Sequence, residues 1–165
     1  AGYTITKYLI DLGHRNIGFV GGSLASFRYK GFRKAMREAG LKCPESRVFI
    51  FEEGSIDGTA AAAKDFLNSN PEITALSCAT DMRAIGVMKA AASLGKRVPD
   101  DLSVAGVDDI SGLYPVSPAL TTMHFPRKEV GRELVALADS MKSSGGVETR
   151  LLLTSLAKKD SCCKF

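Results

Sequence analysis

The residues best placed to contact a small molecule stand directly after short apolar runs, at positions 21–28, 52–56, 80–83 and 108–109. From these positions we select as candidate ligand contacts Ser23, Ser26, Arg28, Thr80 and Asp108. They combine a guanidinium fork, a carboxylate and hydroxyl groups, so together they offer hydrogen-bond donors and acceptors. This mixture suits a sugar or another small polar molecule.

Catalytic and cofactor motifs are missing from the same positions. Gly18, Gly21 and Gly22 do not have the spacing of the dinucleotide-binding G-x-G-x-x-G pattern. The chain contains neither a GxxxxGK[ST] phosphate loop nor a G-x-S-x-G nucleophile elbow. We therefore expect no catalytic residues and no cofactor.

The histidines and the paired aspartates do not change this expectation. His14 and His124 lie far along the chain from any nucleophile or metal-ligand cluster. A catalytic histidine needs a positioned partner, so we expect His14, which follows a helix-ending glycine, to cap or pack there. Asp108 and Asp109 are adjacent, and successive side chains at the end of a strand point in opposite directions. Only one of the two is expected to face a cleft, and no metal site is predicted.

Composition and charge describe one ordinary domain. The 165 residues are 45% hydrophobic and 24% charged, with a formal net charge of +4. Scattered basic residues are interpreted as solvated helix surface rather than as a nucleic-acid-binding face: Arg33, Lys34 and Arg37 on one segment, Arg127, Lys128 and Arg132 on another. No apolar run approaches the roughly 20 residues of a membrane span, and no signal segment is recognisable.

The cysteines indicate a reducing compartment. Cys43, Cys78, Cys162 and Cys163 lack the spacing of a zinc site, and the adjacent pair has poor geometry for a bridge between neighbours. We expect reduced thiols in a cytoplasmic protein, with Cys78 as a small core residue.

Helical and strand-like segments alternate along the chain. Apolar periodicity and stop signals predict helices over 2–12, 26–39, 57–67 and 81–94, and strands over 17–20, 48–51, 73–79 and 102–107. Four such strand–helix units predict an α/β fold with a mostly parallel sheet and helices on both faces. Ligands of such sheets bind outside the carboxyl ends of the strands, where the candidate contacts stand.

After residue 109 the alternation breaks. A loop containing Gly112, Pro115 and Pro118 precedes a predicted strand over 120–123 and a helix over 127–141. A turn over 143–146 and a last strand over 150–156 are expected to complete the chain.

Five ordered segments resemble the signatures of the LacI/GalR family of bacterial transcription regulators. They are LGHRNIGF at 12–19, RYKGF at 28–32, ATDMRAIG at 79–86, VPDDLSVAGVDD at 98–109 and PALTT at 118–122. The family patterns that they match are LGHRxIxFI, RxxGF, ANDxxAxG, VPxDlSVxGxDD and PxLTT. The resemblance covers nearly the whole chain.

The resemblance implies a particular organisation. Family members carry a helix-turn-helix head, a hinge helix and a two-lobed sensor related to periplasmic sugar-binding proteins. Residues 1–123 and 149–165 are thus expected to form the C-terminal lobe, a three-layer α/β/α, Rossmann-like unit of the periplasmic-binding-protein type I. Residues 124–148 would be a crossover helix segment that belongs to the other lobe in the family. Head, hinge and most of the first lobe are expected to be absent, and the helix to pack on its own lobe or on a second copy.

Site roles also follow from the resemblance. Arg28 matches the arginine that holds effector hydroxyls or carboxylates, and Asp108 the aspartate that accepts hydrogen bonds from the effector. Thr80 stands where the family usually has asparagine, which removes an amide donor. Ser23 and Ser26 are contacts of lower rank, and Asp81 is expected to cap the following helix.

Other interpretations stay open for these residues. Arg28 could instead be a surface ion-pair partner, and Asp108 a turn residue bonded to its own backbone. For Thr80 ligand contact and a structural role are equally weighted. The closing segment 157–162, which resembles the family's VxRxS strand, is interpreted as structural.

The resulting hypothesis is the effector-sensing, dimerising part of a LacI-type transcriptional regulator. It would bind a sugar-like effector, form a homodimer through the faces around 57–66 and 81–93, and reach DNA only through the missing head. We expect a cytoplasmic protein that contacts no membrane and is no enzyme. The alternatives are a periplasmic sugar-binding transport receptor and an isolated single-lobe α/β protein without ligand.

Overall fold

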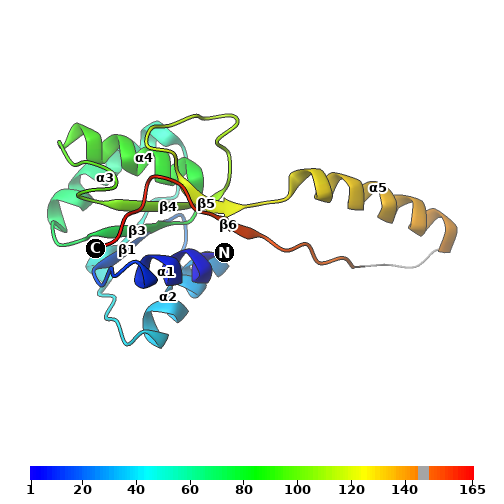
Figure 1. Cartoon of the computed structure of the whole chain (residues 1–165), viewed down its shortest axis with the longest axis horizontal. Helices are drawn as coiled ribbons and strands as arrows, with labels where there is room; N and C mark the ends of the chain where they lie inside the picture. Colours follow the sequence, from blue (N-terminus) through cyan, green and yellow to red (C-terminus); the bar gives the residue numbers. More distant parts are fainter. Residues whose placement is uncertain (145–148) are drawn as a thin grey trace.

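A six-stranded sheet forms the centre of the computed structural model, which describes residues 1–144 and 149–165 (Figure 1). Its strand order is β2-β1-β3-β4-β5-β6, and β1 to β5 run parallel while β6 is antiparallel to β5. The strands are β1 (Ile17–Gly21), β2 (Val48–Ile50), β3 (Ala75–Cys78), β4 (Ser103–Asp108), β5 (Thr121–His124) and β6 (Ser155–Ala157). The predicted α/β fold with a mostly parallel sheet is confirmed.

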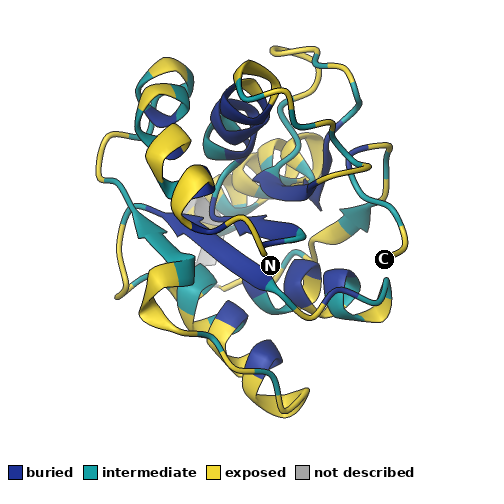
Figure 2. Cartoon of the chain, turned by 90° about the vertical axis from the view of Figure 1, so that its left-hand side faces the viewer, coloured by how far each residue is buried: buried dark blue, intermediate teal, exposed yellow. Residues whose placement is uncertain are grey.

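Two helices cover each face of the sheet. The helices α1 (Gly2–Asp11) and α2 (Phe27–Glu38) lie on one face, and α3 (Ile56–Ser69) and α4 (Asp81–Ser93) on the other. Figure 2 shows the buried strands between these layers. Phe19 of β1 packs with Leu9 and Phe32 on the first face, while its neighbour Val20 packs in the core that contains Ala63 and Val87 on the second. The alternation of side chains along each strand therefore supplies two cores.

Short polar side chains begin three of these helices. Ser26, Ser55 and Thr80 accept hydrogen bonds from backbone N–H groups three residues further on, at the starts of α2, α3 and α4. Since each cap follows a strand, the helix begins at the carboxyl edge of the sheet. The predicted bounds of α1 to α4 agree with the observed ones to within two residues, whereas the helix predicted over 127–141 extends three residues further, to Ser144.

Two glycines are required by close approaches. Gly86 lets α4 approach α3, because a Cβ there would lie 2.7 Å from the Ile56 carbonyl oxygen. Gly13 has a φ of +103° and ends α1, and a Cβ on it would lie 2.5 Å from the Phe165 carbonyl oxygen. The C-terminus thus folds back over the end of α1.

His14 packs beside this C-terminal contact, as predicted. It is buried, with Nδ1 2.9 Å from Thr74 Oγ1 and Nε2 3.1 Å from Ser103 Oγ, and its ring stacks on Phe165. Burial lowers the pKa of His14, against a smaller opposing effect of the Cys163 carbonyl. His14 therefore has a structural role at the edge of the sheet far from the candidate contacts.

The helix α5 (Arg127–Ser144) projects away from the sheet (Figure 1). We call this helix together with the returning segment 149–154 the arm. Leu134 and Val135 are 61% and 65% exposed, and on the returning segment Leu151 is 86% exposed. The expectation that this helix packs on its own lobe is wrong, because the chain leaves β5 and returns to β6 at one edge and holds the helix beyond it. An ion pair between Arg150 and Glu133 ties the returning segment to α5. Packing on a second copy stays a prediction.

The end of the chain differs from the prediction as well. The last strand was expected over 150–156, yet residues 149–154 form no strand and β6 covers Ser155–Ala157. The reason is that β5 ends at His124, whose partner is Ser155, so no strand lies opposite the preceding residues. Residues 158–162 are likewise not a strand, although Ser161 binds the backbone of Val104. The predicted turn over 143–146 lies partly outside the described residues.

Most of α4, one of the two segments expected to pair protomers, is buried inside the lobe, and only residues such as Lys89 and Ala92 remain exposed for such a contact. Ala84, Val87, Met88 and Ala90 are buried, because α4 packs against the sheet and against its neighbour α3. The small residues of α4 thus serve the core. Cys43, Cys78, Cys162 and Cys163 are all free, and Cys78 is buried in the core as expected.

Candidate functional site

The candidate contacts gather at the carboxyl edge of the sheet, which we call the rim site and define by Ser23, Ser26, Arg28, Thr80 and Asp108. Strands β1, β3 and β4 are neighbours in the sheet, so the residues that follow them share one edge. The structure brings two of the five into direct contact. Arg28 Nη2, from the first turn of α2, lies 3.1 Å from Asp108 Oδ1 at the end of β4.

The two partners of this ion pair remain partly open to solvent. The Arg28 side chain is 40% exposed and that of Asp108 is 34% exposed. Burial raises the pKa of Asp108, while Arg28 and then Arg127 act in the opposite direction. Arg28 is thus an ion-pair partner, as one of the two interpretations predicted, and its partner is another rim residue.

The backbone turns sharply at the end of β4. Asp108 has a φ of 121° and Asp109 a φ of 49°, a region that non-glycine residues adopt rarely. Arg127 supports this turn, since its Nη1 donates to the Asp109 carbonyl at 3.0 Å and its Nη2 to the Asp108 carbonyl. Strained backbone of this kind persists where surrounding contacts hold it.

The turn sends the two aspartates to different partners. Asp108 meets Arg28, whereas Asp109 accepts hydrogen bonds from Lys159 Nζ at 2.8 Å and contacts His124 Nδ1 at 2.8 Å. Burial acts to raise the pKa of Asp109, but Lys159, His124 and Ser111 outweigh it and lower the pKa to about 2. Only Asp108 faces the rim site, which agrees with the opposite directions expected of adjacent side chains.

The three hydroxyl groups of the rim site are engaged with the backbone. Ser26 Oγ accepts from Tyr29 N at 3.2 Å, and Thr80 Oγ1 from Arg83 N at 3.4 Å. Ser23 Oγ accepts from Ala25 N at 3.1 Å. Each hydroxyl keeps a proton to donate. Helix capping and ligand contact are thus compatible roles for Ser26 and Thr80.

Asp81 does not cap α4, contrary to expectation. It is buried and accepts hydrogen bonds from Thr122 Oγ1 at 2.6 Å and from Ile110 N at 3.0 Å. Burial raises the pKa of Asp81, and these two bonds act in the opposite direction. Thr80, one residue earlier, takes the capping position because it is the last residue with extended backbone. Asp81 instead joins the loop after β4 to β5.

Arg83 is a second cation at the rim, and no role was predicted for it from the sequence pattern. Its Nη2 donates to the carbonyl oxygens of Phe51 at 3.0 Å and of Glu52 at 3.2 Å. A Cβ on Gly22 would lie 2.6 Å from Nη2, and one on Gly54 3.1 Å from Nη1. The guanidinium therefore lies flat between two rim loops and holds the loop after β2 against α4. The available signal was its position in the first turn of the helix that follows β3.

The rim site is one open wall rather than an enclosed cavity. A hollow of about 680 Å³ lies elsewhere, around Arg33 and Cys43. Small-molecule sites usually cover most of the ligand, which a single wall does not do. Among residues 1–144 and 149–165, no group of three or more His, Cys, Asp or Glu could hold a metal ion, and no helix is long and apolar enough to cross a bilayer. The arrangement suits one half of a binding cleft.

The amino-acid sequence is similar to those of known transcription regulators. The family described as "Periplasmic binding protein-like domain" matches residues 6–162. A relative in Pasteurella multocida (strain Pm70), the HTH-type transcriptional repressor PurR, is 41% identical over 144 residues, which cover 82% of this chain and 42% of that protein. The repressor of the same name in Histophilus somni (strain 129Pt) is 38% identical and is matched over 92% of this chain and 46% of its own length. The chain spans less than half the length of these relatives.

The structure is also similar to solved structures of transcription regulators. A sugar-binding transcriptional regulator of the LacI family from Escherichia coli, complexed with phosphate, superposes with a TM-score of 0.84 at 27% identity, covering 99% of this chain and 60% of that one. The complex of the transcriptional regulator CelR with cellobiose has a TM-score of 0.83 at 29% identity, covering 97% and 50%. The transcriptional repressor AscG of Escherichia coli has a TM-score of 0.84 at 27% identity, covering 98% and 60%.

Proposed function

Because this chain belongs to the LacI/GalR family, as part of its effector-binding domain, we propose that it senses a small polar effector at the rim site. Its relatives are transcriptional repressors rather than enzymes. In a full-length regulator, effector binding would control a helix-turn-helix head. The chain would thus supply one wall of the sensor.

The observation that carries the proposal is the contact between Arg28 and Asp108. A guanidinium donates hydrogen bonds only and a carboxylate accepts them only, so the pair presents both functions at one point. A ligand hydroxyl or amide that enters between them can accept from Arg28 and donate to Asp108. Thr80, Ser23 and Ser26 would add hydroxyl contacts along the same edge.

A sugar-like effector is the ligand class we favour. Vicinal hydroxyl groups act as donors and acceptors at once, which matches the mixed chemistry of the rim site. The cellobiose complex of the related regulator CelR supports this class. The repressor PurR of Pasteurella multocida is more similar in sequence, at 41% identity against 29% for CelR, so the test must also offer nucleobases and nucleosides.

The second wall of the cleft would come from outside residues 1–165. We propose that residues 1–123 and 149–165 form the C-terminal lobe and that 124–148 cross to the other lobe. The exposed Leu134, Val135 and Leu151 on the arm support this, since apolar area costs about 25 cal/mol per Å² while it stays in water. The regulator would act in the cytoplasm as a homodimer, with the exposed sides of α3 and α4 as the candidate faces.

Two alternatives make different demands. A periplasmic transport receptor requires a signal peptide upstream of this segment, whereas a regulator requires a helix-turn-helix. An isolated lobe would bind sugars weakly or not at all, because it offers one wall only.

Calorimetric titration of the full-length protein tests the proposal. Sugars, nucleobases and nucleosides are titrated one at a time, and at least one is expected to bind with a defined stoichiometry and to change the affinity for operator DNA. Binding by none of them, in a protein that is folded and binds DNA, would contradict the effector-sensing role.

A further inference from the structure

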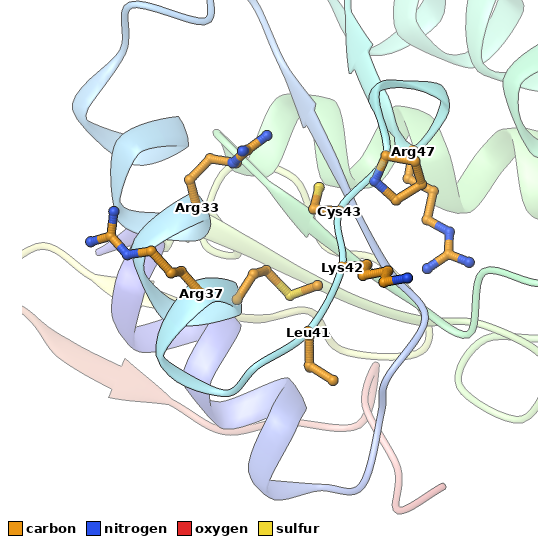
Figure 3. Close-up of a pocket in the computed structure, with 8 residues that line it drawn as sticks. Arg33, Arg37, Leu41, Lys42, Cys43 and Arg47 are labelled. Carbon is orange, nitrogen blue, oxygen red and sulfur yellow. The ribbon is translucent and has the colours of Figure 1, made fainter.

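A basic hollow lies at the edge of the sheet opposite the rim site. It has a volume of about 680 Å³ and sits between the C-terminal half of α2 and the loop that leads through the short 3-10 helix Glu45–Arg47 to β2 (Figure 3). We call it the basic pocket and define it by its lining residues, Arg33, Met36, Arg37, Leu41, Lys42, Cys43, Pro44 and Arg47. Because α2 starts at the carboxyl edge and runs back along the sheet, its end lies far from Arg28.

The charged residues that line the pocket are all basic. Arg33, Arg37, Lys42 and Arg47 line it, and none of its lining residues is acidic. Arg47 is paired at 3.0 Å with Glu72, which is not a lining residue. Within the described part of the chain, Arg37 and Lys42 form no ion pair with a carboxylate. The pocket therefore holds positive charge that the protein does not neutralise.

Arg33, Lys34 and Arg37 are exposed, as predicted for solvated helix surface, but Arg33 and Arg37 also line the basic pocket. Arg33 and Arg37 are one helical turn apart and so lie on one side of α2, where the loop adds Lys42 and Arg47. Lys34, between them in sequence, turns to Glu38 at 3.8 Å instead. The gathering depends on the path of the loop, which sequence spacing does not reveal.

The pocket also has an apolar floor. Met36 is buried, and Leu41, Cys43 and Pro44 form the wall opposite α2. Figure 3 shows Arg33 reaching from α2 toward Cys43, whereas Arg37 extends away from the loop, and Lys42 and Arg47 extend from the loop away from α2. Burial raises the pKa of Cys43, and Arg33 and Arg47 act in the opposite direction. Basic residues thus border a patch of aliphatic and sulfur atoms, and Arg33 lies over it.

We propose that the basic pocket is a second ligand site, separate from the rim site, that binds a small organic phosphate. Arginine forks match phosphate oxygens in pairs, and a concave site lined by one sign of charge concentrates ligands of the opposite sign. The volume falls within the roughly 300–1,000 Å³ of small-molecule sites. The phosphate would be bound by Arg33, with Arg37 and Lys42 turned toward it from the two sides of the opening, and the organic part would lie against Met36, Leu41 and Pro44.

The test follows backbone amide shifts of the 17.6 kDa chain by NMR during titration with phenyl phosphate, inorganic phosphate, benzoate and phenol. Phenyl phosphate is expected to bind most tightly and to shift amides at 33–37 and 41–47. Phenol is expected to cause no saturable shift. Equal affinity for benzoate and phenyl phosphate would overturn the assignment to phosphate. Shifts confined to 22–28 and 80–83 would place the anion at the rim and overturn the second site.

Matched variants separate the pocket from general charge attraction. The double variant Arg33→Gln with Arg37→Gln is expected to bind phenyl phosphate about tenfold more weakly. The control, Lys30→Gln with Lys34→Gln, removes the same charge at the same spacing on α2 but outside the pocket, and is expected to change the affinity less than about twofold. Both variants alter exposed side chains and should keep the wild-type melting temperature within a few degrees. Equal weakening in both variants would overturn the proposal.

Discussion

The guanidinium of Arg28 lies 3.1 Å from the carboxylate of Asp108, although 80 positions separate the two residues in sequence. One follows β1 and the other ends β4, and the parallel order β1-β3-β4 brings both to one edge. Since both side chains are more than one third open to solvent, a ligand can enter the pair without breaking the core.

The exposure of this pair predicts a small effect on stability. Arg28→Gln is expected to change the free energy of unfolding by less than about 1 kcal/mol, because exposed ion pairs contribute little. Urea denaturation at pH 7 measures this. A loss of several kcal/mol would mean that Arg28 is a structural residue.

Arg83 is predicted to act as a positioning residue for the rim. Arg83→Met removes the donors that hold the carbonyls of Phe51 and Glu52, so the loop after β2 should loosen and effector affinity should fall about three- to tenfold. Calorimetry on the full-length regulator measures the affinity. Unchanged binding in the variant would remove Arg83 from the site.

A second variant checks the geometry of Arg83. Gly22→Ala places a Cβ 2.6 Å from Arg83 Nη2 and should displace the guanidinium. The substitution is therefore expected to weaken effector binding in the wild-type background and to have little further effect beside Arg83→Met. Additive effects in this double-mutant cycle would show that the two residues act independently.

The lowered pKa of Asp109 predicts that the protein loses stability in acid. Its pKa in the folded protein is about 2, below the ordinary aspartate value of 3.8, so its contribution to stability is present above pH 3.8 and is lost as the pH falls toward 2. Asp109→Asn is expected to flatten this part of the curve of unfolding free energy against pH. Ser111→Ala, which removes one of several partners, should give an intermediate curve, whereas a wild-type curve for Asp109→Asn would contradict the assignment.

The lowered pKa of His14 predicts a second loss of stability as the pH falls. Because burial lowers its pKa below the ordinary histidine value of 6.5, the neutral form is favoured in the folded state. Stability is therefore full above pH 6.5 and declines as the pH falls through the pKa of the folded state. His14→Gln should lose stability at pH 7.5 and lack this decline. A decline that persists unchanged in the variant would assign it to other groups.

The exposed leucines of the arm predict self-association of the isolated chain. Replacing Leu134 and Leu151 by serine is expected to lower the association constant measured by sedimentation. Leu113→Ser is the control, since Leu113 is 76% exposed but lies in the loop after β4. Equal effects of the control and arm variants would indicate nonspecific hydrophobic association rather than an uncovered interface.

Local signals in the sequence were sufficient for most of the fold. The apolar runs that precede Ser26 and Thr80 predict β1 and β3, and these two capping residues predict the starts of α2 and α4. The predicted bounds of these four elements agree with the structure to within about two residues. The parallel order then follows from the alternation of strands and helices, and it brings Arg28 and Asp108 to one edge.

The errors concern residues whose roles depend on distant partners. Asp81 was expected to cap α4, but the Thr122 hydroxyl and the loop after β4 engage it across the fold. Arg83 is bound by carbonyls of a loop 31 and 32 positions away. The strand expected over 150–156 was shortened because its neighbour β5 ends first. None of these partners is visible in local spacing.

The most direct measurement is the affinity of the full-length regulator for its effector, once found, in Arg28→Gln compared with Lys30→Gln. The two positions lie on different sides of α2, and only the first contacts Asp108. We predict a loss of about 10- to 100-fold for Arg28→Gln and almost none for Lys30→Gln. Equal affinities in wild type and Arg28→Gln would contradict the proposal that the pair of Arg28 and Asp108 is the centre of the effector site.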